Sequence, residues 1–263
     1  MDLYIQFSKR RGIFQFVRQV SLILGICGAL YPGNLRAQGS IFDKVLETAG
    51  QMNDKLLKVT ELTDDEENKI GVEVDKKIMK DHQKGTYTKY DVAKIFERVK
   101  KNIKRKNIKY RFRIVKDKEV NAFAIVGGMV YLNTGLLDYI SSDDELAFVI
   151  GHEISHNEYK HCAHKIQYAA RASKLSPVLG NVVQIAYNVA TVPFSKEDEY
   201  QADSGGVAIM QKSGFDKQGA LDFFDKLYKM EKKHGVEKRD GLNDFISSHP
   251  TAEKRKERIK KEF

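Results

Sequence analysis

Apolar residues in the first part of the chain recur at steps of three and four, the period of a helix that buries one face. Charged residues occupy the positions between them. The pattern predicts three amphipathic helices, at 43–57, 64–84 and 90–103. The second opens on Thr63-Asp64-Asp65-Glu66, a hydroxyl followed by acidic residues, which is typical of a helix start.

The hydrophobic period changes to two at 110–115, which predicts a half-buried strand. Two short β-prone runs, 121–126 and 129–132, flank Gly127-Gly128 and predict a hairpin turn or bulge. Helical spacing returns after this hairpin. The chain is therefore expected to have an α+β fold, mostly helical, with a small sheet.

The N-terminus has the pattern of an export signal, with basic residues at 9–11 and an apolar run at 20–30. We expect residues 1–37 to be a signal peptide, cleaved before Gln38. A retained membrane anchor is one alternative, although the run is shorter than the ~20 apolar residues of a span. Lipidation at Cys27 is another. An exported chain would act in the periplasm or outside the cell.

The net charge of +9 raises the question of nucleic acid or an anionic membrane as a partner. Part of this charge lies in the expected signal peptide, and the rest is mixed with acidic residues on helical stretches. The densest run, Lys104-Arg105-Lys106, has no row of aromatic residues beside it, as a nucleic-acid platform would need. We therefore expect solvated helix faces and no nucleic-acid partner.

The candidate chemistry centres on His152-Glu153-Ile154-Ser155-His156. Two histidines four residues apart lie on one face of a helix, where both can bind the same metal ion. Glu153 is placed to take a proton from a metal-bound water. The residues from Ser141 predict the start of this helix, and an apolar run before the histidines indicates that it is buried. Cys162, expected on the continuation of the helix, is interpreted as a small buried hydrophobe.

A catalytic zinc ion takes three protein ligands, so the third ligand decides the class of site. The metzincin spacing requires a histidine where Cys162 stands, and the thermolysin-like spacing requires a glutamate near Leu175, where there is none. Glu199 and Asp203 remain, four residues apart on one face of a predicted helix. One carboxylate can bind the metal while the other hydrogen-bonds a ligating histidine.

With these residues the chain resembles the gluzincin metallopeptidases of peptidase family M48, the family of HtpX and the CAAX prenyl protease, especially its soluble periplasmic members. The resemblance covers about 110–263. It rests on elements in the family's order: Asn121-Ala122-Phe123-Ala124 with Gly127-Gly128, Gly135-Leu136-Leu137, the H-E-x-x-H with His161, Glu199 with Asp203, and Ser248-His249-Pro250 with Arg255.

This resemblance implies a zincin-like catalytic domain at 109–263, preceded by a helical part at 38–108. The residues that it assigns to Zn²⁺ and its surroundings are the ligands His152, His156 and Glu199, the general base Glu153, and the supporting Asp203 and Arg255. His249 would either stabilise the oxyanion or cap the zinc ion in a resting state. His161 would be structural or would support a ligand, and 253–263 would be a charged helical tail.

We therefore expect a zinc endopeptidase that acts on unfolded or misassembled envelope proteins. An extended substrate would pair with the edge strand formed by Ala122, Phe123, Ala124 and Ile125. A plain hairpin packed on the helix is the alternative. The rival function is a chaperone-like binder of unfolded chains whose zinc is capped by His249. A purely structural zinc site is a third option.

The most apolar stretch beyond the N-terminus, 178–190, carries a polar stripe on one helix face. The stripe predicts a core helix rather than a membrane span. A mobile helix at the mouth of the active site, in contact with substrate or a membrane surface, is the alternative.

Overall fold

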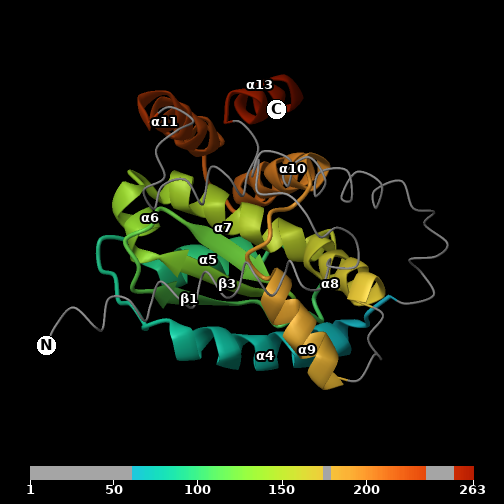
Figure 1. Ribbon diagram of the computed structural model, residues 1–263. Coiled ribbons are helices and arrows are strands. Elements are labelled where there is room, and N and C mark those ends of the chain that lie inside the picture. Colours follow the sequence, from blue (N-terminus) through green and yellow to red (C-terminus); the bar gives the residue numbers. More distant parts are fainter. Residues whose placement is uncertain (1–60, 174–178, 235–251) are drawn as a thin grey trace, which may run out of the picture. The chain divides into compact units, whose positions relative to one another are not determined.

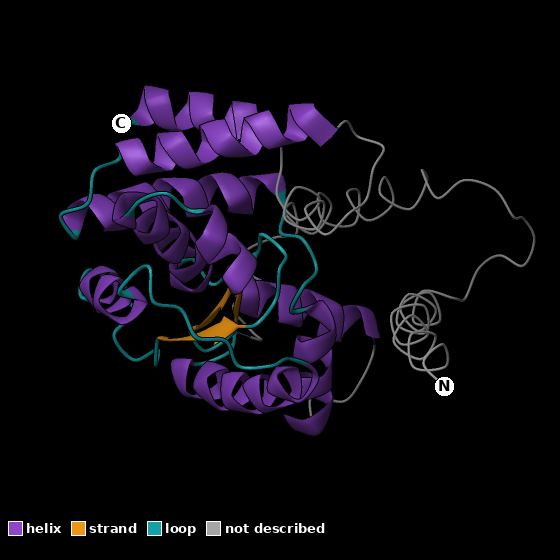
Figure 2. Ribbon diagram, turned by 90° about the vertical axis from the view of Figure 1, so that its left-hand side faces the viewer, coloured by secondary structure: helices purple, strands orange, loops and turns teal. Residues whose placement is uncertain are grey.

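A computed structural model describes residues 61–173, 179–234 and 252–263. A small sheet lies between helices on either side (Figures 1 and 2). On one side are α4 (Asp64–Asp81) and α9 (Leu179–Val189), which pack on each other. On the other side, α7 (Asp143–Glu158) packs on the sheet and α10 (Lys196–Lys212) packs on α7. The expected mostly helical α+β fold is confirmed.

The remaining helices complete these layers, and α11 and α13 pack together beyond α10 and α7 (Figure 1). They are α5 (Val92–Lys100), α6 (Thr134–Tyr139), α8 (His161–Ser173), α11 (Gln218–His234) and α13 (Ala252–Glu262).

The sheet has three strands, β1 (Arg111–Val115), β2 (Ala122–Ile125) and β3 (Met129–Asn133), in the order β1-β3-β2. Strands β2 and β3 form the predicted antiparallel hairpin, and Gly127 and Gly128 in its turn have φ values of 80° and 82°. Both therefore adopt a backbone conformation that favours glycine. The parallel pairing of β1 with β3 was not predicted.

Helix α4 is fastened to the sheet by one buried carboxylate. Asp75 accepts hydrogen bonds from Arg113 Nε at 2.6 Å and from the Tyr131 hydroxyl at 2.8 Å. Arg113 is consequently half-buried, and β1 lacks a clean alternation of buried and exposed residues. Helix α4 ends at Asp81, before the predicted end, because Lys84 forms an antiparallel bridge with Val115 of β1.

The prediction that the metal-binding helix continues to Cys162 was wrong. Helix α7 ends at Glu158, Lys160 has a positive φ of 61°, and α8 starts at His161. The chain therefore turns between the two helices. Cys162 is buried as predicted, and burial raises the pKa of its thiol to about 12.

Helix α9 is the predicted core helix, with Val183 and Ala186 buried and its polar stripe on the other face. In that stripe Gln184 donates to Asn188 and accepts from Lys77 of α4. Within the described ranges, no helix is both long and apolar enough to cross a bilayer.

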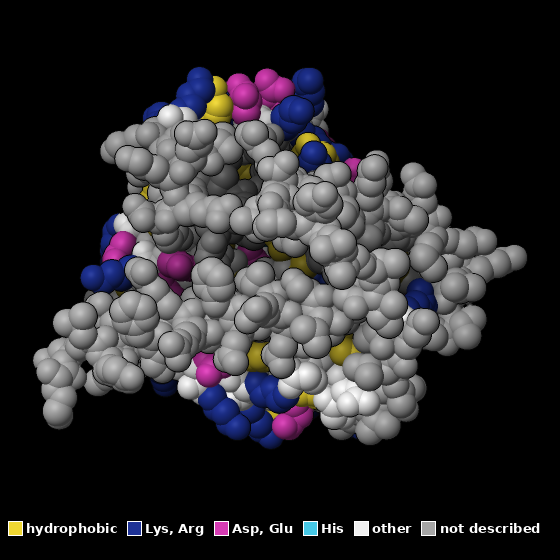
Figure 3. Space-filling model, viewed as in Figure 1, with side chains coloured by type: hydrophobic (Ala, Val, Ile, Leu, Met, Phe, Trp, Pro, Cys, Tyr) yellow, Lys and Arg dark blue, Asp and Glu magenta, His cyan; other side chains and the backbone are white. Residues whose placement is uncertain are grey.

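Charges on the described surface are mixed. Lys and Arg side chains lie next to Asp and Glu along the lower edge of Figure 3, where α4 lies. The exposed ion pair between Lys76 and Glu73 is one example. The predicted signal peptide at 1–37, the predicted helix at 43–57 and His249 lie outside the described residues.

Candidate metal centre and active site

Three glycines set the distance between α7 and α10. A Cβ atom on Gly206 would lie 2.8 Å from the backbone nitrogen of His152, and one on Gly151 would lie 2.9 Å from the Gly206 carbonyl oxygen. A Cβ on Gly205 would lie 2.6 Å from Ser155 Oγ. The two helices can therefore touch backbone to backbone, which brings the acidic residues of α10 opposite the histidines of α7.

Two imidazoles and one carboxylate converge at this crossing. The Nε2 atoms of His152 and His156 are 3.2 Å apart, and each is 3.5 Å from a carboxylate oxygen of Glu199. All three side chains are buried. Among the residues that the structure describes, this is the one set of three or more potential ligands that could hold a metal ion. Two nitrogens and one carboxylate oxygen are a typical donor set for catalytic zinc, so the residues fit that ion.

Glu153 is also buried, one position after His152 on the same helix. Its negative charge contributes to the raised pKa of Arg255 and opposes the lowering of the pKa of Lys165, so it lies within electrostatic reach of both. Helix α7 thus carries both predicted histidine ligands and the predicted general base into the same buried region.

The first histidine is held by charged residues, Asp203 and Arg255, which we call the carboxylate support. Asp203 Oδ1 lies 3.0 Å from His152 Nδ1, and Arg255 donates to both Asp203 oxygens, at 2.6 and 2.7 Å. Arg255 also lies 3.4 Å from Glu199. Burial raises the pKa of Asp203, but Arg255 and His152 outweigh it and the pKa is lowered.

In the absence of metal, these contacts also change the pKa of His152. Burial lowers its pKa, yet the carboxylates of Asp203 and Glu199 outweigh burial and raise the pKa to about 9. Arg255 belongs to α13, so the predicted charged tail is more than an appendage. Its arginine is 2% exposed and reaches the centre of the site.

The second histidine is held by uncharged groups, His161 and Gln201, which we call the imidazole support. His156 Nδ1 lies 3.1 Å from His161 Nδ1, and His161 Nε2 lies 2.8 Å from Gln201 Oε1. Asp198 Oδ1 is 3.5 Å from the same Nε2 atom. Burial lowers the pKa of His161. His161 therefore lies beside the second predicted histidine ligand, and its structural or supporting role stays a prediction.

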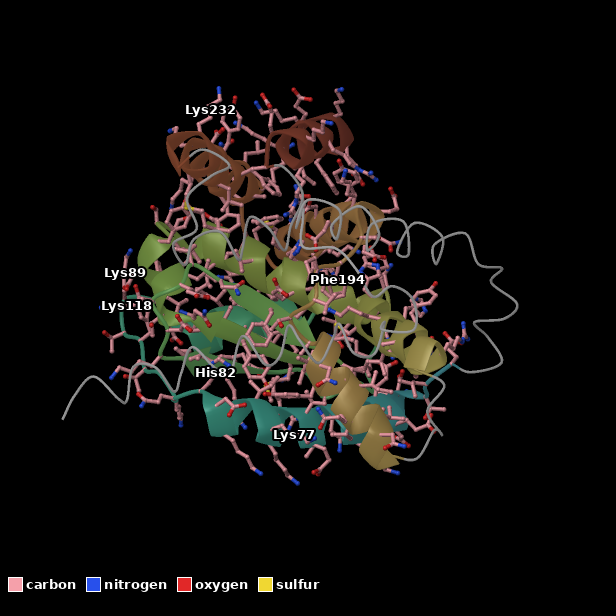
Figure 4. The ribbon with its side chains drawn as sticks, in the orientation of Figure 1. Lys77, His82, Lys89, Lys118, Phe194 and Lys232 are labelled. Carbon is pink, nitrogen blue, oxygen red and sulfur yellow. The ribbon has the colours of Figure 1, made fainter. Side chains whose placement is uncertain are left out.

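An aromatic ring covers His156. Phe194, labelled in Figure 4, belongs to the segment between α9 and α10. Its ring stacks on the imidazole with ring centroids 3.8 Å apart and an interplanar angle of 14°. Lys165 Nζ lies 3.8 Å from the Phe194 ring centroid and donates to the Val192 carbonyl at 2.8 Å. Burial lowers the pKa of Lys165 to about 8.

Sequence reasoning missed Gln201, Phe194 and Lys165. Gln201 carried one usable signal, because it lies between Glu199 and Asp203 on the same helix. No pattern in the sequence points to Phe194 or Lys165, because their contacts depend on how the segment after α9 folds back towards α7.

Strand β2 is the edge of the sheet beside the site. Asn133 N donates to Asn121 O, so the alternation of an antiparallel pair turns the backbone groups of Ala122 and Ala124 away from β3. Cys162 Sγ donates to Ala124 O at 3.7 Å. Helix α7 packs on β2, and the backbone N–H of Gly128 in the hairpin turn donates to a side chain of α7. The predicted substrate edge therefore lies against the helix that carries the two predicted histidine ligands.

Comparison with known proteins agrees with this geometry. A family model described as peptidase family M48 matches residues 87–263. The chain is 32% identical to the mitochondrial metalloendopeptidase OMA1 of Arabidopsis thaliana over 154 residues, which cover 56% of this chain and 30% of that protein. It is 32% identical to the beta-barrel assembly-enhancing protease of Escherichia coli over 136 residues, covering 45% and 28%.

A third relative, the mitochondrial metalloendopeptidase OMA1 of Schizosaccharomyces pombe, is 24% identical over 213 residues, covering 73% of this chain and 62% of that protein. The chain thus spans about a third of the length of the first two relatives. The family match covers most of the chain and contains all three potential metal ligands. The chain therefore belongs to peptidase family M48, a family of metallopeptidases.

Proposed function

We propose that this protein is a zinc endopeptidase with His152, His156 and Glu199 as its metal ligands. The observation that carries the proposal is the buried convergence of these three side chains at the α7–α10 crossing. Three protein ligands leave a coordination position for water and substrate, which distinguishes a catalytic site from a structural one.

The chain's own residues divide the work as follows. The two Nε2 atoms and the Glu199 carboxylate hold the ion, and Glu153 takes a proton from the attacking water and returns it to the leaving amine. Zinc, when bound, lowers the pKa of that water and polarises the scissile carbonyl. Asp203 and Arg255 hold His152 in orientation.

The substrate would bind as an extended chain along β2. The outward backbone groups of Ala122 and Ala124 are suited to strand addition, with Phe123 and Ile125 completing the edge. The weak S–H bond from Cys162 to Ala124 O would be exchanged for an N–H bond from the substrate. Unfolded proteins supply such extended segments.

We further propose that residues 1–37 direct export, that 38–108 precede a catalytic domain at 109–263, and that the substrates are unfolded or misassembled envelope proteins. The basic and apolar pattern at the N-terminus supports export. The name of the Escherichia coli relative connects that protein with beta-barrel assembly, and the other two relatives are named as mitochondrial. His249 is proposed to stabilise the oxyanion or to cap the zinc ion.

The proposal can be tested with the full chain. We would measure zinc content and cleavage of an unfolded protein for wild type, Glu153→Gln and His249→Ala, with the exposed Glu97→Gln as a control. Glu153→Gln is expected to keep zinc and to lose at least about 10²-fold in cleavage rate, the lower end for a missing general base. The control should match wild type.

Two results would contradict the proposal. Zinc without cleavage in both wild type and His249→Ala would exclude the peptidase and favour a binder of unfolded chains. A wild type that binds no zinc would exclude the metal site itself.

A further inference from the structure

A histidine binds a metal ion through a nitrogen lone pair, and neutral imidazole has only one such nitrogen. In His156 the nitrogen that faces the other ligands is Nε2, 3.2 Å from His152 Nε2 and 3.5 Å from Glu199. The proton of His156 must therefore be on Nδ1. For His152 the carboxylate of Asp203 accepts from Nδ1 and enforces this arrangement. At the corresponding contact of His156 lies the imidazole of His161.

The partner of His156 Nδ1 is another imidazole nitrogen, His161 Nδ1, at 3.1 Å. An imidazole can donate or accept, so this contact alone does not fix the proton. The other nitrogen of His161 decides it, because it faces oxygen atoms of Gln201 at 2.8 Å and of Asp198 at 3.5 Å. Oxygen atoms of this kind accept hydrogen bonds, so His161 Nε2 carries the proton and His161 Nδ1 is left as an acceptor.

We propose that His161 is a positioning residue that fixes the tautomer of His156. Its Nε2–H donates to Gln201, its Nδ1 accepts from His156 Nδ1–H, and the Nε2 lone pair of His156 is directed at the zinc ion. This inference rests on the proposed function, because it assumes that His156 is a metal ligand.

The opposite tautomer of His161, with its proton on Nδ1, is incompatible with the contacts of its Nε2 atom. If His161 Nδ1–H donated to His156, the proton of His156 would be on Nε2 and would occupy the metal side. His161 Nε2 would then present a lone pair to the two oxygens of Gln201 and Asp198. The carboxylate of Asp198 supports the assigned tautomer independently of Gln201, because an ionised carboxylate cannot donate.

We call the two hydrogen bonds, from His156 to His161 and from His161 to Gln201, the relay. The side chains around His161 keep its ring in the position that the relay needs. His161 is 4% exposed, and its ring packs against Tyr159 and Phe194 at centroid distances of 5.7 and 6.1 Å. The turn at Lys160, with its positive φ, places His161 at the start of α8 rather than on the continuation of α7. The break between the helices therefore has a function, since it brings His161 back beside His156.

Three variants of the full chain test the relay. His161→Phe keeps a ring of similar size but removes the acceptor, whereas His161→Asn retains an acceptor near the original Nδ1 position. His164→Phe changes the next histidine of α8, which we assign no part in the relay. Zinc affinity is measured by competition with a chelator. We expect His161→Phe to weaken it about 10- to 100-fold, His161→Asn to recover most of the loss, and His164→Phe to leave it unchanged.

Nitrogen NMR of histidine-labelled, zinc-loaded wild type gives a readout that does not depend on any variant folding. The expected spectrum has His156 protonated on Nδ1 and His161 protonated on Nε2. A proton on His161 Nδ1, or zinc affinity in His161→Phe equal to wild type, would overturn the relay while leaving the peptidase intact. Absence of zinc from wild type would instead refute the proposed function, and the relay with it.

Discussion

The two histidines of one helix are supported in opposite ways. The carboxylate support of His152 is a buried ion pair that joins α10 to α13. The imidazole support of His156 is uncharged and joins α8 to α10, and His156 itself lies under an aromatic ring. Charged groups bind each other strongly but are costly to bury alone, whereas neutral groups mainly set orientation. We therefore expect the first support to contribute more to the stability of the fold, and the second to act mainly on metal affinity.

The largest effect is expected from Arg255→Met in the metal-free protein. The change removes the cation that pairs with both oxygens of the buried Asp203 and leaves only His152 beside it. It should lower the free energy of unfolding by about 3–5 kcal/mol, measured by urea denaturation in chelator. Gln201→Leu, in the imidazole support, should cost about 1 kcal/mol. The exposed Arg258→Met is the matched control and should change stability by less than about 0.5 kcal/mol. Equal losses of unfolding free energy in Arg255→Met and Gln201→Leu would contradict the proposed difference between the two supports.

A smaller effect is expected at the two glycines that α10 contributes to the helix crossing, which face different atoms of the α7 region. Gly206→Ala directs its Cβ at the backbone of His152, whereas Gly205→Ala directs it at the side chains of Ser155 and Tyr159. Gly206→Ala should cost about 1–3 kcal/mol, by overpacking, and should cost more than Gly205→Ala because backbone yields less.

Gly180→Ala on α9 is the control for these glycines, since nothing lies within 4 Å of its added Cβ. It should be neutral or stabilising by up to about 1 kcal/mol, because alanine favours a helix. Thermal unfolding of the three variants checks the order. A Gly206→Ala protein as stable as Gly180→Ala would show that the helices do not need their close approach.

The last expected effect is a pH dependence of zinc binding, which requires no substitution. With its pKa raised to about 9, His152 is protonated at pH 7 without metal and must lose that proton to bind zinc. Apparent zinc affinity should therefore rise roughly tenfold per pH unit from 7 towards 9 and then level off. The same shift stabilises the metal-free fold in full below pH 6.5, and this contribution is lost as pH rises through about 9.

Calorimetry in buffers of different ionisation enthalpy counts the protons released on zinc binding. Asp203→Asn removes one carboxylate that raises the pKa of His152, so this variant should release fewer protons at pH 7.5. Unchanged proton release would place the ionisation elsewhere in the site.

Local signals in the sequence were sufficient for the elements that carry the ligands. The Ser142 cap predicted the start of α7, and the glycine pair predicted the β2–β3 hairpin. The sequence did not predict the features that depend on tertiary contacts or on one unusual backbone angle. The parallel β1–β3 pair depends on a long connection, and the helix break depends on a single residue, Lys160, with an uncommon φ.

The residues of the candidate site also separate into those that the sequence predicts and those that require the structure. The spacing of His152 and His156 predicted their convergence, and the spacing of Glu199 and Asp203 predicted a shared face. The choice of Glu199 as ligand and the part of Arg255 came from resemblance. Gln201 and Phe194 required the structure, because neither residue type is distinctive of a metal site.

The ion pair between Asp203 and Arg255 also has a consequence for the order of events during synthesis. Arg255 follows Asp203 by 52 residues in the chain, so the carboxylate leaves the ribosome first. At about 5–20 residues per second, its cation is made roughly 3–10 seconds later. Until then the counter-charge beside Asp203 is His152, without the arginine that pairs with both carboxylate oxygens. The residue that completes the carboxylate support is therefore made after the histidine and the carboxylate that it joins.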